Sequence, residues 1–176
     1  KYLGKAWKDS EGKSKIYPFW MNVLKEIFPT NIDTDYDTLL ESGARGLGKS
    51  QVACGAVGAY LMYRVMCLKN PQAHFHLQPT EKIIFAFMNI TKEASKKIAI
   101  DKFQKTIQLS PWFMEKGKMT QFENNPFWIP PEPLQIVIGS QSSDIIGLPV
   151  SFAFFDEISF IRNQDIDVQK KKATDM

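Results

Sequence analysis

The chain has 176 residues, of which 44% are hydrophobic and 23% charged, and its formal net charge is +3. This composition excludes a chain that is disordered throughout, and the length allows one domain with a sizeable core. The most apolar run, residues 52–63, is too short to span a membrane, and we recognise no signal peptide.

The first part of the chain is predicted to hold an arm, a helix and a strand. Residues 1–15 are polar and basic and are expected to form an N-terminal arm, with residues 16–176 forming one domain. Apolar residues spaced by three and four predict a helix that begins at Pro18 and stops at Pro29. A short strand is expected over residues 36–41.

A long helix should follow, beginning at Lys49 and ending before Pro71. Its sequence is apolar nearly all round, so we expect it to be buried against a sheet. Gly55 and Gly58 weaken this helix, but they allow a close neighbour.

Strands and helices alternate in the rest of the chain. The continuous apolar run 83–88 is typical of a buried parallel strand. Thr91 is predicted to cap a helix that runs to about Leu109 and is ended by Ser110–Pro111. Further expectations are a loop or hairpin over 112–133, strands over 134–138 and 151–155, and a flexible polar segment over 139–144. This alternation predicts an α/β fold with a mostly parallel sheet and helices on both faces.

The strongest motif is the run GARGLGKS at residues 43–50, which fits the phosphate-binding pattern GxxxxGK[ST]. Glycines let the backbone fold tightly so that several N–H groups face a phosphate, and the following helix adds the positive end of its dipole. Lys49 would place its charge on the outer phosphates, and the Ser50 hydroxyl would bind Mg²⁺. The alternative is a glycine-rich turn with a surface lysine, which the flanking apolar strand and helix disfavour. The predicted nucleotide-binding residues here are Gly43, Ala44, Arg45, Gly46, Leu47, Gly48, Lys49, Ser50 and Gln51.

A second motif, FAFFDE at residues 152–157, is an apolar strand that ends in two acids, the Walker B pattern. Open α/β sheets bind ligands at the carboxyl ends of their strands. Asp156 would hold Mg²⁺, and Glu157 would orient and deprotonate the attacking water. The alternative is a solvated strand end, but with a P-loop upstream we favour the catalytic interpretation. Together the motifs predict an Mg-dependent ATPase of the ASCE type, the P-loop group with a catalytic Glu beside the Walker B Asp.

Three weaker features favour ordinary structural roles. Cys54 and Cys67 belong to no CxxC pair and are predicted to be buried thiols in a reducing compartment. His74 and His76 have no further metal ligands nearby and are assigned to a solvated loop. One predicted helix carries several lysines, which could track phosphates but more simply form a solvated face: Lys92, Lys96, Lys97, Lys102 and Lys105.

The P-loop, with Arg45 standing ahead of its Gly-Lys-Ser end, resembles that of large terminase subunits, the DNA-packaging motor ATPases of tailed bacteriophages. Residues 83–89 with the helix after them, and residues 152–157, are also similar to that family. Residues 17–20, Tyr-Pro-Phe-Trp, resemble its aromatic adenine-binding segment. The resemblance covers most of residues 17–162 and concerns the N-terminal ATPase part of that family.

The resemblance implies roles for individual residues. Glu157, Arg45 and Lys49 would be catalytic, with Arg45 helping to neutralise phosphate charge. The adenine base would be bound by Tyr17, Phe19 and Trp20. The chain departs from the family in lacking a Gln near Trp20 and in having Ile146–Gly147 where an Arg-Gly pair is common. We also expect a truncated ATPase domain, because no coupling motif and no nuclease domain follow Glu157.

The implied function is ATP-driven translocation of double-stranded DNA into a prohead, in the cytoplasm of a host cell. The implied partners are double-stranded DNA, the portal protein of the prohead, a small terminase subunit and further copies of the chain in a ring. Two alternatives stay open. One is a helicase or another nucleic-acid translocase of the same ATPase group. The other is a nucleotide-binding module without turnover, against which the pair Asp156–Glu157 argues.

Overall fold

The computed structural model describes residues 11, 13, 16–28, 38–39, 46–89, 91–123, 125–140, 145 and 147–155. The predicted first helix is confirmed as α1, Pro18–Ile27, with Pro18 in its first turn. Of the predicted strand 36–41, only Thr38 and Leu39 are described, and both lie in a loop. A search of the described residues finds no helix that is long and apolar enough to cross a membrane.

The centre of the fold is a parallel sheet of three strands in the order β4-β1-β5. These strands are β1 (Ile83–Met88), β4 (Leu134–Gly139) and β5 (Val150–Phe155), so the three predicted strands in this part of the chain are confirmed. Every residue of β1 is buried, as its continuous apolar sequence predicts for a central parallel strand. Because both neighbours run parallel to β1, all three carboxyl ends meet at one end of the sheet.

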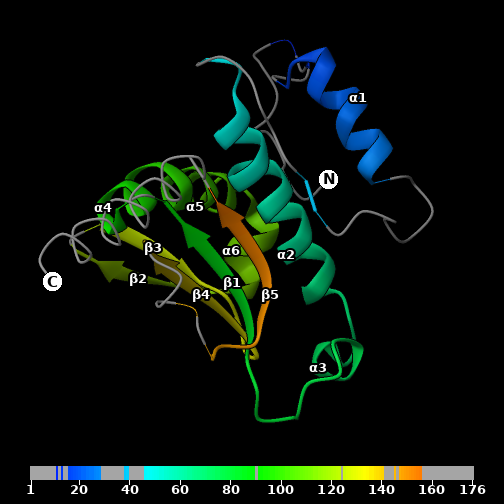
Figure 1. Ribbon diagram of the computed structural model, residues 1–176, viewed down its shortest axis with the longest axis vertical. Coiled ribbons are helices and arrows are strands. Elements are labelled where there is room, and N and C mark those ends of the chain that lie inside the picture. The colour runs from blue at the N-terminus through cyan, green and yellow to red at the C-terminus, as the bar shows by residue number, and fades with distance from the viewer. Residues whose placement is uncertain are drawn as a thin grey trace, which may run out of the picture.

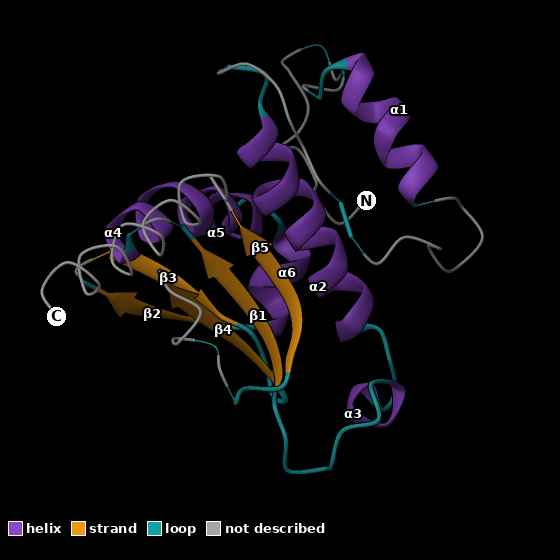
Figure 2. Ribbon diagram, viewed as in Figure 1, coloured by secondary structure: helices purple, strands orange, loops and turns teal. Residues whose placement is uncertain are grey.

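The predicted long helix runs without a break from Lys49 to Met66. It consists of residues 49–50, a π-helical segment η2 (Gln51–Val57) and α2 (Gly58–Met66). Its first turn lies at the end of the sheet toward which β1 and β5 point, and from there it descends along the strands (Figure 1). Figure 2 shows α1 beyond α2, on the side away from the strands, and Phe28 next to α1 makes an edge contact with Tyr60 of α2.

The helix that Thr91 was predicted to cap is also confirmed. It consists of α4 (Lys92–Ala94), η3 (Ser95–Ile100) and α5 (Asp101–Gln108), and the Thr91 hydroxyl accepts the N–H of Ala94 at 3.0 Å. Phe103 of α5 packs on Phe87 of β1, which stacks on Phe154 of β5 at 4.8 Å between ring centroids. This aromatic layer joins α5 to two strands of the sheet.

Gly58 lets the two long helical segments cross closely, as its position in the apolar helix predicts. A Cβ atom at Gly58 would lie 3.2 Å from the ring of Phe103. At Gly55 the corresponding atom would lie 3.1 Å from the Thr106 hydroxyl of α5. Larger residues at these two positions would therefore push α5 away from the helix that begins at Lys49.

The segment 112–133, for which a loop or hairpin was expected, contains an antiparallel hairpin of β2 (Lys118–Phe122) and β3 (Asn125–Ile129). A short helix that the sequence did not predict, α6 (Pro111–Lys116), precedes it. Trp128 of β3 is fully buried, and its indole N–H donates to the Phe113 carbonyl at 2.9 Å. The hairpin is thus fastened to α6 by its largest side chain.

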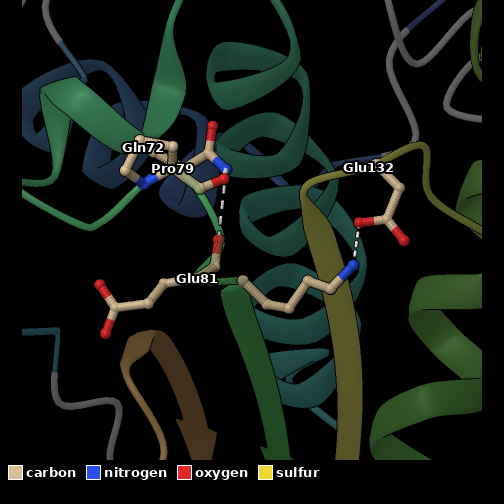
Figure 3. A network of polar contacts seen from close by, with 5 residues as sticks. Gln72, Pro79, Glu81 and Glu132 are labelled. Atoms are coloured by element: carbon tan, nitrogen blue, oxygen red, sulfur yellow. Dashed lines mark hydrogen bonds and ion pairs between the residues drawn. The ribbon is translucent and has the colours of Figure 1, made fainter.

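A network of polar contacts surrounds the loop before β1, at the amino ends of the parallel strands (Figure 3). Gln72, in the short helix α3 (Pro71–His74), donates its side-chain amide to the Pro79 carbonyl at 2.7 Å and to the Glu81 carbonyl at 3.3 Å. Lys82 forms an ion pair with Glu132 in the loop before β4. These contacts fix the start of β1.

One prediction about the cysteines is wrong. Cys54 is buried, as expected, but Cys67 is exposed. The reason is that α2 ends at Met66, so Cys67 lies just beyond the helix and outside its buried face.

Candidate functional site: a P-loop beside an aromatic helix

The described part of the P-loop has the backbone that its glycines predict. Gly46 and Gly48 have φ angles of +85° and +78°, a left-handed conformation that glycine adopts at little cost. Helical structure begins at Lys49, and the Val52 N–H donates to the Gly48 carbonyl at 2.9 Å. The loop therefore turns sharply into a helix N-terminus, where backbone N–H groups and the helix dipole favour an anion.

Helix α1 contributes the aromatic side of the site. Trp20 is only 6% exposed, and its indole N–H donates to the Leu47 carbonyl in the P-loop at 2.7 Å. The ring of Tyr17 lies against the loop, because a Cβ atom at Gly48 would be 3.9 Å from it. Tyr17 is 60% exposed, so it presents ring surface to a ligand beside the loop. Phe19 is 67% exposed and makes an edge contact with Trp20.

The Walker B strand ends where the sequence predicts. The last residue of β5, Phe155, pairs with Met88, the last residue of β1. Asp156 and Glu157 follow Phe155 directly in the chain, so β5 leads into them at the carboxyl end of the sheet. This is the end at which open α/β sheets bind ligands, and also the end at which the helix from Lys49 begins.

Sequence reasoning did not single out Asn89, which follows β1 at this same end. It is completely buried, and its backbone N–H donates to the Gly139 carbonyl of β4 at 3.4 Å. The Asn89 side chain is a buried amide at the carboxyl end of β1, the strand that pairs with β5. It is a candidate for orienting other side chains of the site by hydrogen bonding. The signal in the sequence is a polar residue placed immediately after an unbroken apolar strand.

The predicted site residues divide into two groups. The structure brings one group together at the loop: Tyr17, Trp20, Gly46, Leu47, Gly48, Lys49, Ser50 and Gln51. Phe19 is described and contacts Trp20, but no contact among the described residues places it at the loop. Gly43, Ala44, Arg45, Asp156 and Glu157 lie outside the described residues, so their roles stay predictions. Within the first group, the side-chain nitrogen of Gln51 lies close to Gly55 on the next turn of the helix, 3.2 Å from a Cβ atom placed there.

The side chains predicted to hold a metal here carry oxygen atoms, which are the ligands that Mg²⁺ takes. Among the described residues there is no group of three or more His, Cys, Asp or Glu side chains that could hold a metal ion. Mg²⁺ is usually held by one or two protein oxygens together with substrate phosphates and waters. A Ser50 hydroxyl on the first turn of the helix and the Asp156 carboxylate after β5 would supply such oxygens.

Two lysines of the helix between Thr91 and Ser110 are engaged in ion pairs. Lys96 pairs with Glu123 at the turn of the β2–β3 hairpin, and Lys105 pairs with Asp101 one turn earlier at 2.9 Å. Carboxylate partners lower the positive charge that this surface offers to a nucleic acid. The pairs favour the simpler interpretation of a solvated helix face for these two lysines.

The α/β fold with its parallel sheet, the left-handed glycines and the helix that begins at Lys49 define a P-loop domain of the nucleotide-binding NTPase class. A family model described as "Uncharacterized protein MJ0330, N-terminal P-loop domain" matches residues 26–170, which is most of the chain. The chain belongs to this family. No curated protein and no solved structure matches the chain.

Proposed function

We propose that this domain binds ATP at the P-loop and hydrolyses it in the presence of Mg²⁺. The observation that carries the proposal is the backbone at Gly46–Gly48, which turns into a helix at Lys49 beside the carboxyl end of a parallel sheet. The strand β5 leads at that end into an Asp-Glu pair. P-loop hydrolases use carboxylates of this kind together with a phosphate-binding loop.

The chain's own residues would divide the work as follows. Lys49 and the N–H groups of the loop hold and neutralise the outer phosphates. Glu157 accepts a proton from the water that attacks the γ-phosphorus as the bond to the leaving ADP oxygen breaks. Arg45 stabilises the charge that develops on the transferred phosphoryl group. Mg²⁺, when bound through Ser50 and Asp156, neutralises charge on the phosphate oxygens.

The adenine end of the nucleotide is assigned to α1. Tyr17 and Phe19 are exposed aromatic side chains, Tyr17 next to the loop and Phe19 next to Trp20, and aromatic faces bind purine rings by stacking. The indole N–H of Trp20 is already bonded to the loop. Trp20 would therefore affect binding of the base only by holding Tyr17 and Phe19 in place. This division is a proposal that accounts for the different exposure of the three rings.

The finer proposal is that the ATPase is a DNA-packaging motor of the large-terminase kind. It is supported by Arg45 within the P-loop, by the aromatic segment before it and by the Asp-Glu pair after β5. In that role the partners would be double-stranded DNA, the portal of a prohead, a small terminase subunit and further copies of the chain in a ring. The reaction would take place in the cytoplasm of an infected host cell.

The test measures phosphate release from Mg-ATP with no DNA, with double-stranded DNA and with single-stranded DNA of the same length. A packaging motor is expected to be stimulated most by the duplex, because the duplex is its cargo. Stimulation by single strands alone would favour a helicase or a related translocase. ATP binding without any turnover would contradict hydrolysis and leave a nucleotide-binding module.

A further inference from the structure

One side chain outside the P-loop is bonded directly to its backbone. Trp20 lies in α1, 27 residues before Leu47, and its indole N–H donates to the Leu47 carbonyl at 2.7 Å. Trp20 is 6% exposed, so the donor side of the bond is buried. A buried indole N–H requires an acceptor, because an unmet donor in such a place is costly. The contact therefore constrains both α1 and the loop.

The constrained carbonyl fixes the direction of the next N–H group. The carbonyl of Leu47 and the N–H of Gly48 belong to one peptide unit, and in a planar trans peptide the two point in opposite directions. The only cis peptide among the described residues is Glu132–Pro133, so this unit is trans. With the Leu47 oxygen directed at the indole, the Gly48 N–H is directed away from Trp20.

Gly48 is also fixed on its other side. Its own carbonyl accepts the Val52 N–H at 2.9 Å, which is the first bond of the helix. Glycine at a φ of +78° has alternative backbone conformations of similar energy, so a loop of this kind could rotate the Leu47–Gly48 peptide without outside help. The bond from Trp20 opposes that rotation, because the rotation would leave the indole N–H without its acceptor.

We propose that Trp20 is a positioning residue of the nucleotide site: it holds the Leu47–Gly48 peptide so that the Gly48 N–H points at a bound phosphate. The inference rests on the proposed binding of ATP at the P-loop. It assigns Trp20 to the loop backbone in place of the adenine base. Residues 1–25, which include Trp20, precede the part of the chain that the family model matches.

The test replaces Trp20 by Phe, which keeps an aromatic ring but removes the donor. The matched control is Trp128→Phe, because Trp128 is also buried and also donates its indole N–H to a backbone carbonyl, that of Phe113 at 2.9 Å. Three quantities are measured for each protein: the Kd for Mg-ATP, the melting temperature, and the hydrogen exchange of the peptide that contains Gly46 to Ser50.

Trp20→Phe is expected to weaken Mg-ATP binding by about 3- to 10-fold, the scale of one lost hydrogen bond, and to speed exchange in the loop. Trp128→Phe should lower the melting temperature while leaving the Kd and the exchange of the loop at their wild-type values. Unchanged affinity and exchange in Trp20→Phe would overturn the inference, as would an equal loss of affinity in Trp128→Phe.

The hydrogen exchange separates this inference from the proposed function. Wild-type protein that binds no Mg-ATP would contradict ATP binding, and with it the phosphate half of the inference. Faster exchange in Trp20→Phe would then still establish that Trp20 holds the loop. Wild-type protein that binds Mg-ATP, with Trp20→Phe binding equally well, would overturn the inference alone.

Discussion

At the scale of single residues, Glu157 is the side chain at which binding and chemistry can be separated. Glu157→Gln is nearly isosteric but can no longer accept a proton. We expect it to keep ATP bound and to slow turnover at least about a hundredfold, the scale of lost general-base catalysis. The measurement is the Kd for Mg-ATP beside the rate of phosphate release. Equal losses of binding and turnover would instead give Glu157 a structural or metal-holding role.

The residues of the site were predictable to different degrees. The phosphate loop follows from its sequence, because glycines at fixed positions before Lys-Ser encode both the left-handed turns and the helix start. The bond between Trp20 and Leu47 could not be predicted, since it joins residues 27 apart through tertiary packing. Asn89 follows an apolar strand directly, which is a local signal, but its burial depends on tertiary packing at the strand end and could not be predicted.

At the scale of elements, the attachment of the β2–β3 hairpin depends on Gly117, which separates α6 from β2. A Cβ atom at Gly117 would lie 2.1 Å from the indole nitrogen of Trp128. Trp128 has little freedom to move away, because its backbone N–H and carbonyl both bond the side-chain amide of Gln104, at 2.7 and 3.0 Å. An added methyl group must therefore displace the hairpin or the helix.

We predict that Gly117→Ala lowers the free energy of unfolding by about 3 kcal/mol, at the upper end of the usual cost of overpacking. Urea denaturation measures it. The control is Gly147→Ala, where an added Cβ atom meets nothing within 4 Å and only the φ of +80° is unfavourable, at a cost of about 1–2 kcal/mol. A Gly117→Ala protein as stable as the wild type would contradict the described packing of Trp128.

Among the elements, those with a strong and uniform pattern were predicted best. The strand β1 has the bounds that its apolar run indicates, because a run buried on both faces has sharp ends. The helix α6 was missed: its six residues begin at the proline that was taken only as a stop, and aromatic side chains obscure the helical period. The exposure of Cys67 was missed because the end of α2 carries no strong stop signal before Pro71.

At the scale of the whole molecule, the proposed nucleotide site lies between α1, the P-loop and the carboxyl end of the sheet. These parts are far apart in the sequence. Within the described residues the Trp20–Leu47 bond connects α1 to the P-loop, and Phe28 beside α1 contacts Tyr60 of α2. A ligand that bridges them should stabilise the folded state by mass action. The pattern of alternating strands and helices was sufficient to predict the α/β fold with its parallel sheet, but it could not place α1 against the loop.

ATP hydrolysis at the P-loop is tested most directly by measuring phosphate release from Mg-ATP by the wild-type protein and by Lys49→Ala. Lys49 lies on the first turn of a helix, where Ala is well tolerated, so equal melting temperatures without nucleotide serve as the control for folding. We predict measurable release by the wild type, a loss of at least about a hundredfold in Lys49→Ala, and no release when Mg²⁺ is chelated. Near-normal release by a folded Lys49→Ala protein would contradict the assignment of Lys49 as the lysine of the phosphate site.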